Sequence, residues 1–197
     1  AKYRVVHSGE NSSDAAKGLA FPVAAKIISP EITHKFDAGG VVAGIRDLNE
    51  LETARAQILK SVALKNPSAR IEGILIQEMV RGGFEFLMGG SRDPHFGALL
   101  IFGLGGTLVE ALHDVKFRRV PLTPADADAM MHGIRASVLL EAFRGKPPRD
   151  VAALESCLLR LSLLFSEFPE IAEADLNPVF ALESGAVAAD ARIVLNI

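Results

Sequence analysis

The spacing of apolar residues changes along the chain, and each spacing predicts a different kind of element. From Leu48 to Val62 apolar residues recur at helical intervals after Asp47-Leu-Asn-Glu50, which has the form of a capping box, so we expect a helix of about four turns there. A short helix is expected from Ala15 to Ala20, and two longer ones follow, one after the N-cap signal Thr123-Pro124 and one from Val151 onward. The core-facing stripe of the first of these two is Ala127, Met130, Met131, Ile134 and Val138. The stripe of the second is Val151, Leu154, Leu158, Leu161 and Phe165.

Strands are expected where apolar residues alternate with polar ones or form short runs between turn residues. These segments are residues 3 to 7, the run that carries Lys26, Val41 to Ile45, Ile71 to Val80, Phe84 to Met88, Ala98 to Phe102, Glu173 to Asn177 and Val187 to Leu195.

One lysine, Lys26, lies in the middle of an apolar run. Because an unpaired buried ammonium is costly, such a lysine must be paired or face a cleft, and a bound anion is one suitable partner. The polar turn that follows holds His34, and Gly39 and Gly40 then allow backbone amides to approach a phosphate without a Cβ in the way. The same window equally fits a strand with a snorkelling lysine and a turn that happens to contain His34.

A second glycine cluster, Gly103-Leu-Gly-Gly106, directly follows an expected strand. Its amides can also face a phosphate, although a glycine cluster more often only builds a turn.

Near the end of the chain, strand alternation puts Glu173, Asp175 and Asn177 on one face. If the following turn is centred between Glu183 and Ser184, the returning strand places Asp190 opposite Asn177. Hard oxygen ligands on facing strands suit Mg²⁺, which completes its shell with phosphates and water. A solvated hairpin face with ordinary acids is the alternative that the pattern leaves open.

Composition narrows the classes of function. The chain has 197 residues, of which 49% are hydrophobic, and 21 basic and 24 acidic residues give a net charge of -3. We expect a soluble protein that binds neither nucleic acid nor membrane, since it has no basic face and no apolar run long enough to span a bilayer. The only cysteine, Cys157, falls on a helical apolar stripe and reads as a buried thiol, which favours a cytoplasmic setting.

Several of these segments together resemble the ATP-grasp region of nucleoside-diphosphate-forming acyl-CoA synthetases, relatives of succinyl-CoA synthetase. Lys26 to Val41 is similar to the family's lysine strand and HKxDxGGV loop. Similar motifs follow in the family's order: Gln77-Glu-Met-Val80, Gly83-Phe-Glu85, Asp93 with Phe96-Gly97, Gly103-Leu-Gly-Gly106 with Glu110, Asp114 and Arg118, the Arg144-Gly-Lys-Pro-Pro148 loop, Glu173-Ala-Asp-Leu-Asn-Pro178, and Asp190-Ala-Arg192.

The resemblance implies an α+β ATP-grasp fold with nucleotide between two lobes. The small lobe would comprise residues 1–80 and the large lobe, with a metal-binding hairpin, residues 81–197. Because the chain begins at Ala1, shortly before the lysine strand, we expect a fragment whose small lobe is truncated at its start. The implied nucleotide-binding residues are Lys26, Gly39, Gly40, Glu78, Val80, Glu85, Gly105, Gly106 and Arg118, and the implied metal ligands are Asn177 and Asp190.

In this family, acyl-CoA, ADP and phosphate are converted to acid, CoA and ATP, or the reverse, through a phosphohistidine on a separate CoA-ligase part. The resemblance therefore implies ATP or ADP as substrate, Mg²⁺ as cofactor, and CoA-binding and CoA-ligase domains or an alpha subunit as partner. It implies a ligase that is inactive as this fragment alone. His34 is the candidate for passing the phosphoryl group, because imidazole is a nucleophile that titrates near neutrality; the alternative is that it only hydrogen-bonds the loop.

Three other functions compete with this one. The same region occurs fused to an acetyltransferase in protein lysine acetyltransferases, and it can also serve as a non-catalytic nucleotide-binding module. A carboxylate-amine ligase is less well matched, because the HKxDxGGV loop is not its usual form. Among departures from the family pattern, Phe36 replaces a small polar residue, but none removes a proposed ligand.

Overall fold

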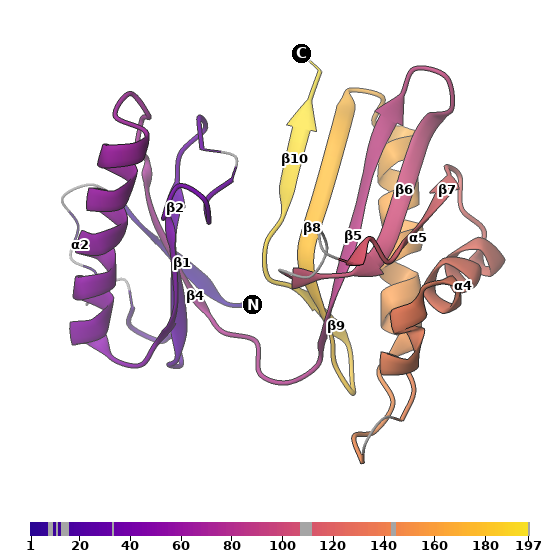
Figure 1. The fold of residues 1–197 in the computed structure, drawn as a ribbon, viewed down its shortest axis with the longest axis horizontal. Helices are drawn as coiled ribbons and strands as arrows, with labels where there is room; N and C mark the ends of the chain where they lie inside the picture. The colour runs from indigo at the N-terminus through magenta and orange to yellow at the C-terminus, as the bar shows by residue number, and fades with distance from the viewer. Residues whose placement is uncertain are drawn as a thin grey trace. The chain divides into compact units, whose positions relative to one another are not determined.

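The computed structural model describes residues 1–7, 10, 12, 16–32, 34–106, 112–142 and 145–196. Contacts within the chain divide it into two compact units, Ala1–Met79 and Val80–Ile197, called the small unit and the large unit below (Figure 1).

The small unit is an antiparallel sheet with one long helix packed against it (Figure 1). The strand order is β1-β4-β2-β3. The helix buries Leu51, Ile58 and Val62 against alternate residues of β2, which explains their helical spacing in the sequence. The elements are β1 (Tyr3–Val6), β2 (Val23–Ile28), β3 (Val41–Ile45), α2 (Leu48–Lys65) and β4 (Gly73–Glu78).

The start of α2 contains half of the expected capping box. The Asp47 side chain accepts a hydrogen bond from the Glu50 amide at 2.9 Å, as an N-cap residue does. The Glu50 carboxylate instead accepts from the Arg46 amide and pairs with the Arg46 guanidinium. The ion pair therefore takes the place of the reciprocal bond back to the N-cap residue.

The large unit is a six-stranded antiparallel sheet with helices on one face (Figure 1). The strand order is β10-β8-β5-β6-β7, and β9 also pairs with β8. We call the side that packs against α4 and α5 the helix face and the other side the opposite face. The elements are β5 (Phe84–Asp93), β6 (Gly97–Leu104), β7 (Val115–Arg119), α4 (Pro124–Gly133), η2 (Arg135–Leu139), α5 (Val151–Glu167), β8 (Ile171–Ala181), β9 (Ala186–Ala188) and β10 (Arg192–Leu195).

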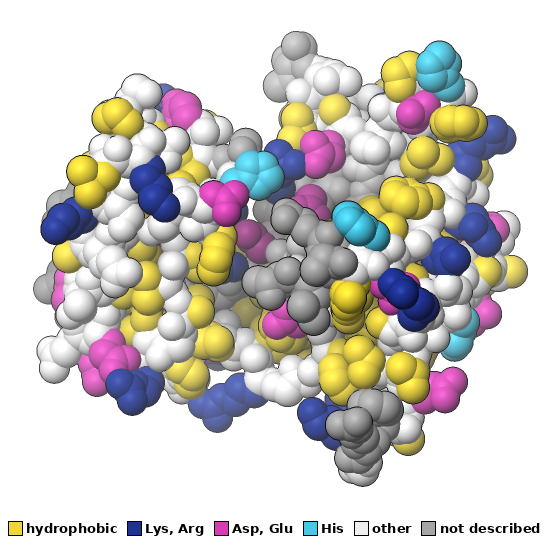
Figure 2. Space-filling model, viewed as in Figure 1, with side chains coloured by type: hydrophobic (Ala, Val, Ile, Leu, Met, Phe, Trp, Pro, Cys, Tyr) yellow, Lys and Arg dark blue, Asp and Glu magenta, His cyan; other side chains and the backbone are white. Residues whose placement is uncertain are grey.

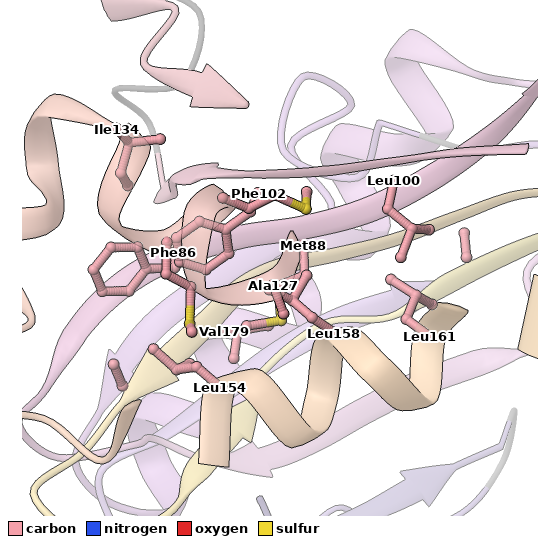
Figure 3. Packing of buried hydrophobic residues seen from close by; sticks show 14 of the residues in the cluster. Phe86, Met88, Leu100, Phe102, Ala127, Ile134, Leu154, Leu158, Leu161 and Val179 are labelled. Carbon is pink, nitrogen blue, oxygen red and sulfur yellow. The ribbon is translucent and has the colours of Figure 1, made fainter. Parts of the chain in front are cut away.

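The core of the large unit lies between its sheet and its helices (Figure 3). The rings of Phe86 and Phe102 stack with centroids 5.3 Å apart. Leu154, Leu158 and Leu161 of α5 are buried against this sheet, so the expected stripe of the last helix is confirmed. Alternation along the strands then fixes which side chains remain on the opposite face.

The helix expected after Thr123-Pro124 ends earlier than its apolar stripe suggests. The cause is a carboxylate distant in sequence, which binds the backbone amides just after the helix. The N-cap at Thr123 is confirmed, but α4 stops at Gly133 and Ile134 is extended. The Asp114 carboxylate accepts hydrogen bonds from the amides of Arg135 (2.8 Å) and Ala136 (2.7 Å). The chain continues as a short 3₁₀ helix, η2, and Val138 is exposed.

The thiol of Cys157 is partly buried, and burial raises its pKa, as expected for an unreactive cysteine on an apolar stripe. On the face that Figure 2 shows, acidic and basic side chains are scattered among neutral and apolar ones. Among the described helices, none is both long and apolar enough to cross a membrane.

The Asp114 contact predicts a pH-dependent stability. Burial would raise the pKa of Asp114, but the hydrogen bonds from Arg135 and Ala136 and the Arg135 charge outweigh it and lower the pKa. A lowered folded-state pKa stabilises the fold above the unfolded-state pKa, and this gain is lost as the pH falls through the folded-state pKa. Asp114→Asn should therefore cost about 1–2 kcal/mol at pH 7.

Urea unfolding at pH 7 and in steps down through pH 3 measures this effect, with Glu141→Gln at an exposed position as control. The gap between wild type and Asp114→Asn should shrink below about pH 4. A gap that does not change with pH would show that the carboxylate charge is not what holds η2.

Candidate functional site

Lys26 lies in the middle of β2 on the sheet face that α2 does not cover. Val23, Ala25 and Ile27 belong to the buried cluster with α2, so alternation places Lys26 on the other face. It pairs in register with Val41 of β3 and Leu75 of β4 and is partly buried.

The segment from His34 to Gly40 closes on itself through backbone hydrogen bonds. The Gly40 amide donates to the Lys35 carbonyl at 2.7 Å, and the Gly39 amide donates to the Phe36 carbonyl at 2.9 Å. These two amides therefore hold the loop together, which differs from their expected use toward a phosphate. A contact of Gly39 and Gly40 with nucleotide stays a prediction. His34, at the start of the segment, is exposed.

Both glycines are required by close packing. A Cβ on Gly40 would lie 2.4 Å from Ile27 Cγ2, and Gly39 has φ +68° with its Cβ position 2.9 Å from Ser61 Cβ. Lys65, in the last turn of α2, donates from Nζ to the Asp37 carbonyl at 2.7 Å. Helix α2 thus supports the loop that carries His34.

A surface pocket of about 350 Å³ lies beside this loop, lined by Glu31, Ile32, His34, Asp37, Ala38, Lys65 and Asn66. Sequence reasoning did not single out Lys65, because a lysine in the last turn of a helix commonly only faces the helix C-terminus. The contact of Lys65 with the loop can be recognised only from the structure, in which the loop packs on the last turn of α2.

Glu78 ends β4 and is tied to the start of the small unit. Its amide donates to the Lys2 carbonyl at 2.9 Å, and its carboxylate accepts from the Ala20 amide at 2.8 Å. Val80 is the first residue of the large unit. Their expected backbone contacts with adenine stay predictions.

Four predicted residues of the large unit come together on its opposite face. The Gly105 amide donates to the Glu85 carbonyl at 2.9 Å, and the Gly106 amide donates to Asn177 Oδ1 at 3.1 Å. Gly106 has φ +71°, and a Cβ there would lie 2.2 Å from Glu85 Oε2. The end of β6 therefore brings the exposed Glu85 carboxylate close to the Asn177 amide.

The hairpin that follows brings Asp190 level with Asn177. Val179 pairs with Ala188 on one side of a break in the ladder, and Asp175 pairs with Arg192 on the other. These pairs have the register expected from the sequence, so that register is confirmed. The break itself was not expected, since one strand was predicted from Val187 to Leu195, and Asp190 lies in it between β9 and β10.

Asn177 and Asp190 fit a magnesium site by the chemistry of their donors. One offers an amide oxygen and the other a carboxylate, and Mg²⁺ takes one or two such ligands with phosphates and water for the rest. Among the described residues, no group of three or more His, Cys, Asp or Glu side chains is placed to hold a metal. A site of this kind would therefore need a ligand such as nucleotide to complete it.

Arg118 is not part of this group, and its expected contact with nucleotide stays a prediction. It pairs with Leu100, whose side chain is in the helix-face core, so Arg118 lies on the helix face. Arg119 and Phe117 take the opposite face. Strand β7 was not predicted from the sequence. The alternation of side chains along it, which decides whether Arg118 or Arg119 lies on a given face, could therefore not be predicted either.

Two other residues of the quoted motifs have structural contacts. Asp93 Oδ1 accepts from the amides of His95 (2.7 Å) and Phe96 (2.9 Å) and so shapes the β5–β6 turn. Asp114 holds η2, as described above. Glu110 and Arg144 lie outside the described residues.

Comparison with known proteins identifies the family. The family described as "ATP-grasp domain" matches residues 1–195, so the chain belongs to the ATP-grasp family. The chain is 43% identical over 196 residues to acetate–CoA ligase (ADP-forming) I of Archaeoglobus fulgidus. This match covers all of this chain but only 28% of the length of that protein. It is 39% identical to the beta subunit of acetate–CoA ligase (ADP-forming) I of Pyrococcus furiosus, covering 98% of this chain and 84% of the subunit.

Solved structures agree with this assignment. The dinucleotide forming acetyl-coenzyme A synthetase 1 of Ca. Korarchaeum cryptofilum, in complex with coenzyme A and Ca-AMPCP, superposes with a TM-score of 0.90 at 40% identity, covering 98% of this chain and 86% of that one. A second structure of it, with coenzyme A and Mg-AMPPCP, gives 0.81 at 38% identity, covering 99% of this chain and 84% of that one. The expected ATP-grasp fold and the resemblance to ADP-forming acyl-CoA synthetases are confirmed.

The contact between Gly106 and Glu85 predicts a measurable coupling. Gly106→Ala should lower stability by about 1–2 kcal/mol, because alanine disfavours the left-handed backbone and its Cβ displaces the Glu85 carboxylate. In a Glu85→Ala background only the backbone cost should be left, so the loss should be smaller.

Gly97→Ala is the matched control, since Gly97 has φ +75° and nothing within 4 Å of its Cβ position. Urea unfolding of the single and double variants measures the coupling. Equal losses from Gly106→Ala with and without the Glu85 carboxylate would mean that the two residues do not constrain each other.

Proposed function

We propose that this chain is the nucleotide-binding part of an ADP-forming acyl-CoA synthetase, a ligase that couples acyl-CoA cleavage to ATP formation or runs the reverse reaction. The observation that carries the proposal is the group on the opposite face of the large unit, where Glu85, Gly106 and Asn177 come together and Asp190 lies level with Asn177. It supplies a carboxylate for ribose hydroxyls, a glycine that leaves room for a ligand, and two oxygen donors for a metal.

Asn177 and Asp190 would hold Mg²⁺, which when bound would offset the negative charge of the nucleotide phosphates. Glu85, beside Gly106, would accept from the ribose hydroxyls. The relatives support this assignment, because two structures of the Ca. Korarchaeum cryptofilum enzyme carry a nucleotide analogue with a divalent cation.

The two units would be the small and large lobes of the ATP-grasp fold. Lys26, on the face of the small sheet opposite α2, would contact the phosphates through its ammonium. His34 would accept the phosphoryl group or pass it on, with its loop held by Lys65 and by the close packing of Gly39.

The proposed reaction needs a partner that this chain does not supply. CoA-binding and CoA-ligase domains, or an alpha subunit, would form a phosphohistidine from acyl-CoA and phosphate and release CoA and the free acid. The phosphoryl group would pass to His34 as the partner's N–P bond breaks. A β-phosphate oxygen of ADP would then attack that phosphorus, the second N–P bond would break, and ATP and free imidazole would result. One structure of the relative bears on this step, since its phosphohistidine segment points towards the nucleotide binding site.

The proposed setting is the cytoplasm. The only cysteine of the chain, Cys157, is a free and partly buried thiol, as is usual in a reducing compartment.

The metal assignment predicts that nucleotide binding depends on Mg²⁺. Calorimetry should show ADP and ATP binding at least about tenfold more tightly with Mg²⁺ than in EDTA, because the metal links phosphates to Asn177 and Asp190. Asp190→Ala should remove most of this difference, and Asp128→Ala, on the exposed side of α4, should not. Equal binding with and without Mg²⁺ would refute the metal site.

The role of His34 is tested with the partner domains present. His34→Ala should greatly reduce ATP formation from acyl-CoA, ADP and phosphate while leaving nucleotide affinity nearly unchanged, because binding and transfer would then be separable. His95→Ala, in the β5–β6 turn, is the control. If His34→Ala retains the wild-type rate, His34 takes no part and the phosphoryl group passes directly from the partner.

A further inference from the structure

The residues of the candidate site follow one line along β8 on the opposite face. Glu85 pairs with Phe180, Asn177 lies level with Asp190, and Asp175 pairs with both Gly89 and Arg192. From Glu85 to Gly89 is four residues of β5, or about 13 Å at the rise of a strand. The row that holds Arg192 is therefore the far end of the site, beyond the proposed metal ligands as seen from Glu85.

Arg192 shares the face of these residues. Its neighbour along β10, Ile193, pairs with Ala174, which is buried in the helix-face core. Alternation therefore puts Arg192, the first residue of β10, on the opposite face with Asp175. About a third of its side chain, 34%, is exposed, so a ligand on this face can reach it.

A carboxylate on the same face fixes the guanidinium of Arg192. Arg192 Nη2 donates to Glu173 Oε1 at 2.5 Å, and Glu173 lies two pairs further along the same two strands, opposite Val194. The bond uses one nitrogen of a group that has five N–H donors in a planar fork. A planar fork anchored at one edge loses less conformational freedom when another edge binds an oxyanion.

We propose that Arg192 contacts the terminal phosphate of bound ATP and that Glu173 is the residue that positions Arg192. This inference rests on the proposed function, and it goes beyond it by naming the residue that distinguishes ATP from ADP. With the ribose at Glu85 and the metal at Asn177 and Asp190, the phosphate chain extends toward the Arg192 row. Only the γ-phosphate, which ADP lacks, reaches the end of that row.

The chemistry of the pair agrees with this role. Guanidinium groups bind phosphate oxygens in two parallel hydrogen bonds, and a fixed cation stabilises the charge of a phosphoryl group in transfer. A surface ion pair made only for stability would contribute little, since Glu173 and Arg192 are 43% and 34% exposed.

The test is calorimetry on the full 197-residue chain with the Mg²⁺ complexes of ADP and of a non-hydrolysable ATP analogue. Arg192→Met should weaken the analogue about tenfold to a hundredfold and ADP less than about threefold. Arg192→Lys keeps the charge without the fork and should weaken the analogue by a smaller factor. If Arg192→Met does not fold, Arg192→Lys still tests the contact with the terminal phosphate.

Variants of Glu173 separate positioning from simple charge. Glu173→Gln keeps an oxygen that can accept from Arg192 and should retain the preference for the analogue over ADP, whereas Glu173→Ala should lose it. Arg70→Met is the control, because Arg70 forms a similar exposed pair with Glu72 (3.0 Å) in the small unit.

The outcomes are distinguishable. If wild type binds neither nucleotide, the proposed function fails and this inference with it. If wild type binds both and the Arg192 variants weaken ADP and the analogue equally or not at all, only this inference fails. If Glu173→Gln is as impaired as Glu173→Ala, Arg192 is not positioned by that hydrogen bond.

Discussion

The hydrogen bond from the Gly106 amide to the Asn177 side chain holds the candidate site of the large unit together. It links the end of β6 to the middle of β8 across the strand that lies between them, β5. The link is possible because Gly105 and Gly106 have no side chains where β5 passes; a Cβ on Gly105 would lie 2.5 Å from the Phe86 backbone. The Glu85 carboxylate is thereby kept beside the amide that is proposed to hold a metal.

The helix face provides the rigidity that this arrangement needs. Phe86 and Phe102 belong to the two strands that carry Glu85 and the glycines, and both are fully buried under α4 and α5. Arg92 of β5 donates to the carbonyls of Phe165 (2.6 Å) and Ile171 (2.8 Å), which fixes the end of α5 to the start of β8. Polar groups can therefore gather on one side of the sheet because apolar packing fixes the other.

Local patterns in the sequence predicted the parts of the fold that depend on neighbouring residues. The stripe of α5 and the register that sets Asn177 level with Asp190 needed only periodicity and a turn position. The end of α4 could not be predicted, because it is set by Asp114, a residue about 20 positions earlier in the chain. The face of Arg118 was missed because β7 was not recognised, and one residue of register decides which side of a sheet an arginine takes.

The central claim is that nucleotide binds on the opposite face of the large unit. Paramagnetic broadening of backbone amide signals by Mn²⁺-ADP tests it directly, because broadening falls off steeply with distance from the metal. Signals of Gly106, Asp175 and Ala191 should be lost first, while those of α4 and α5 persist. Broadening centred on the exposed side of α5, around Arg160 and Leu163, would contradict the account.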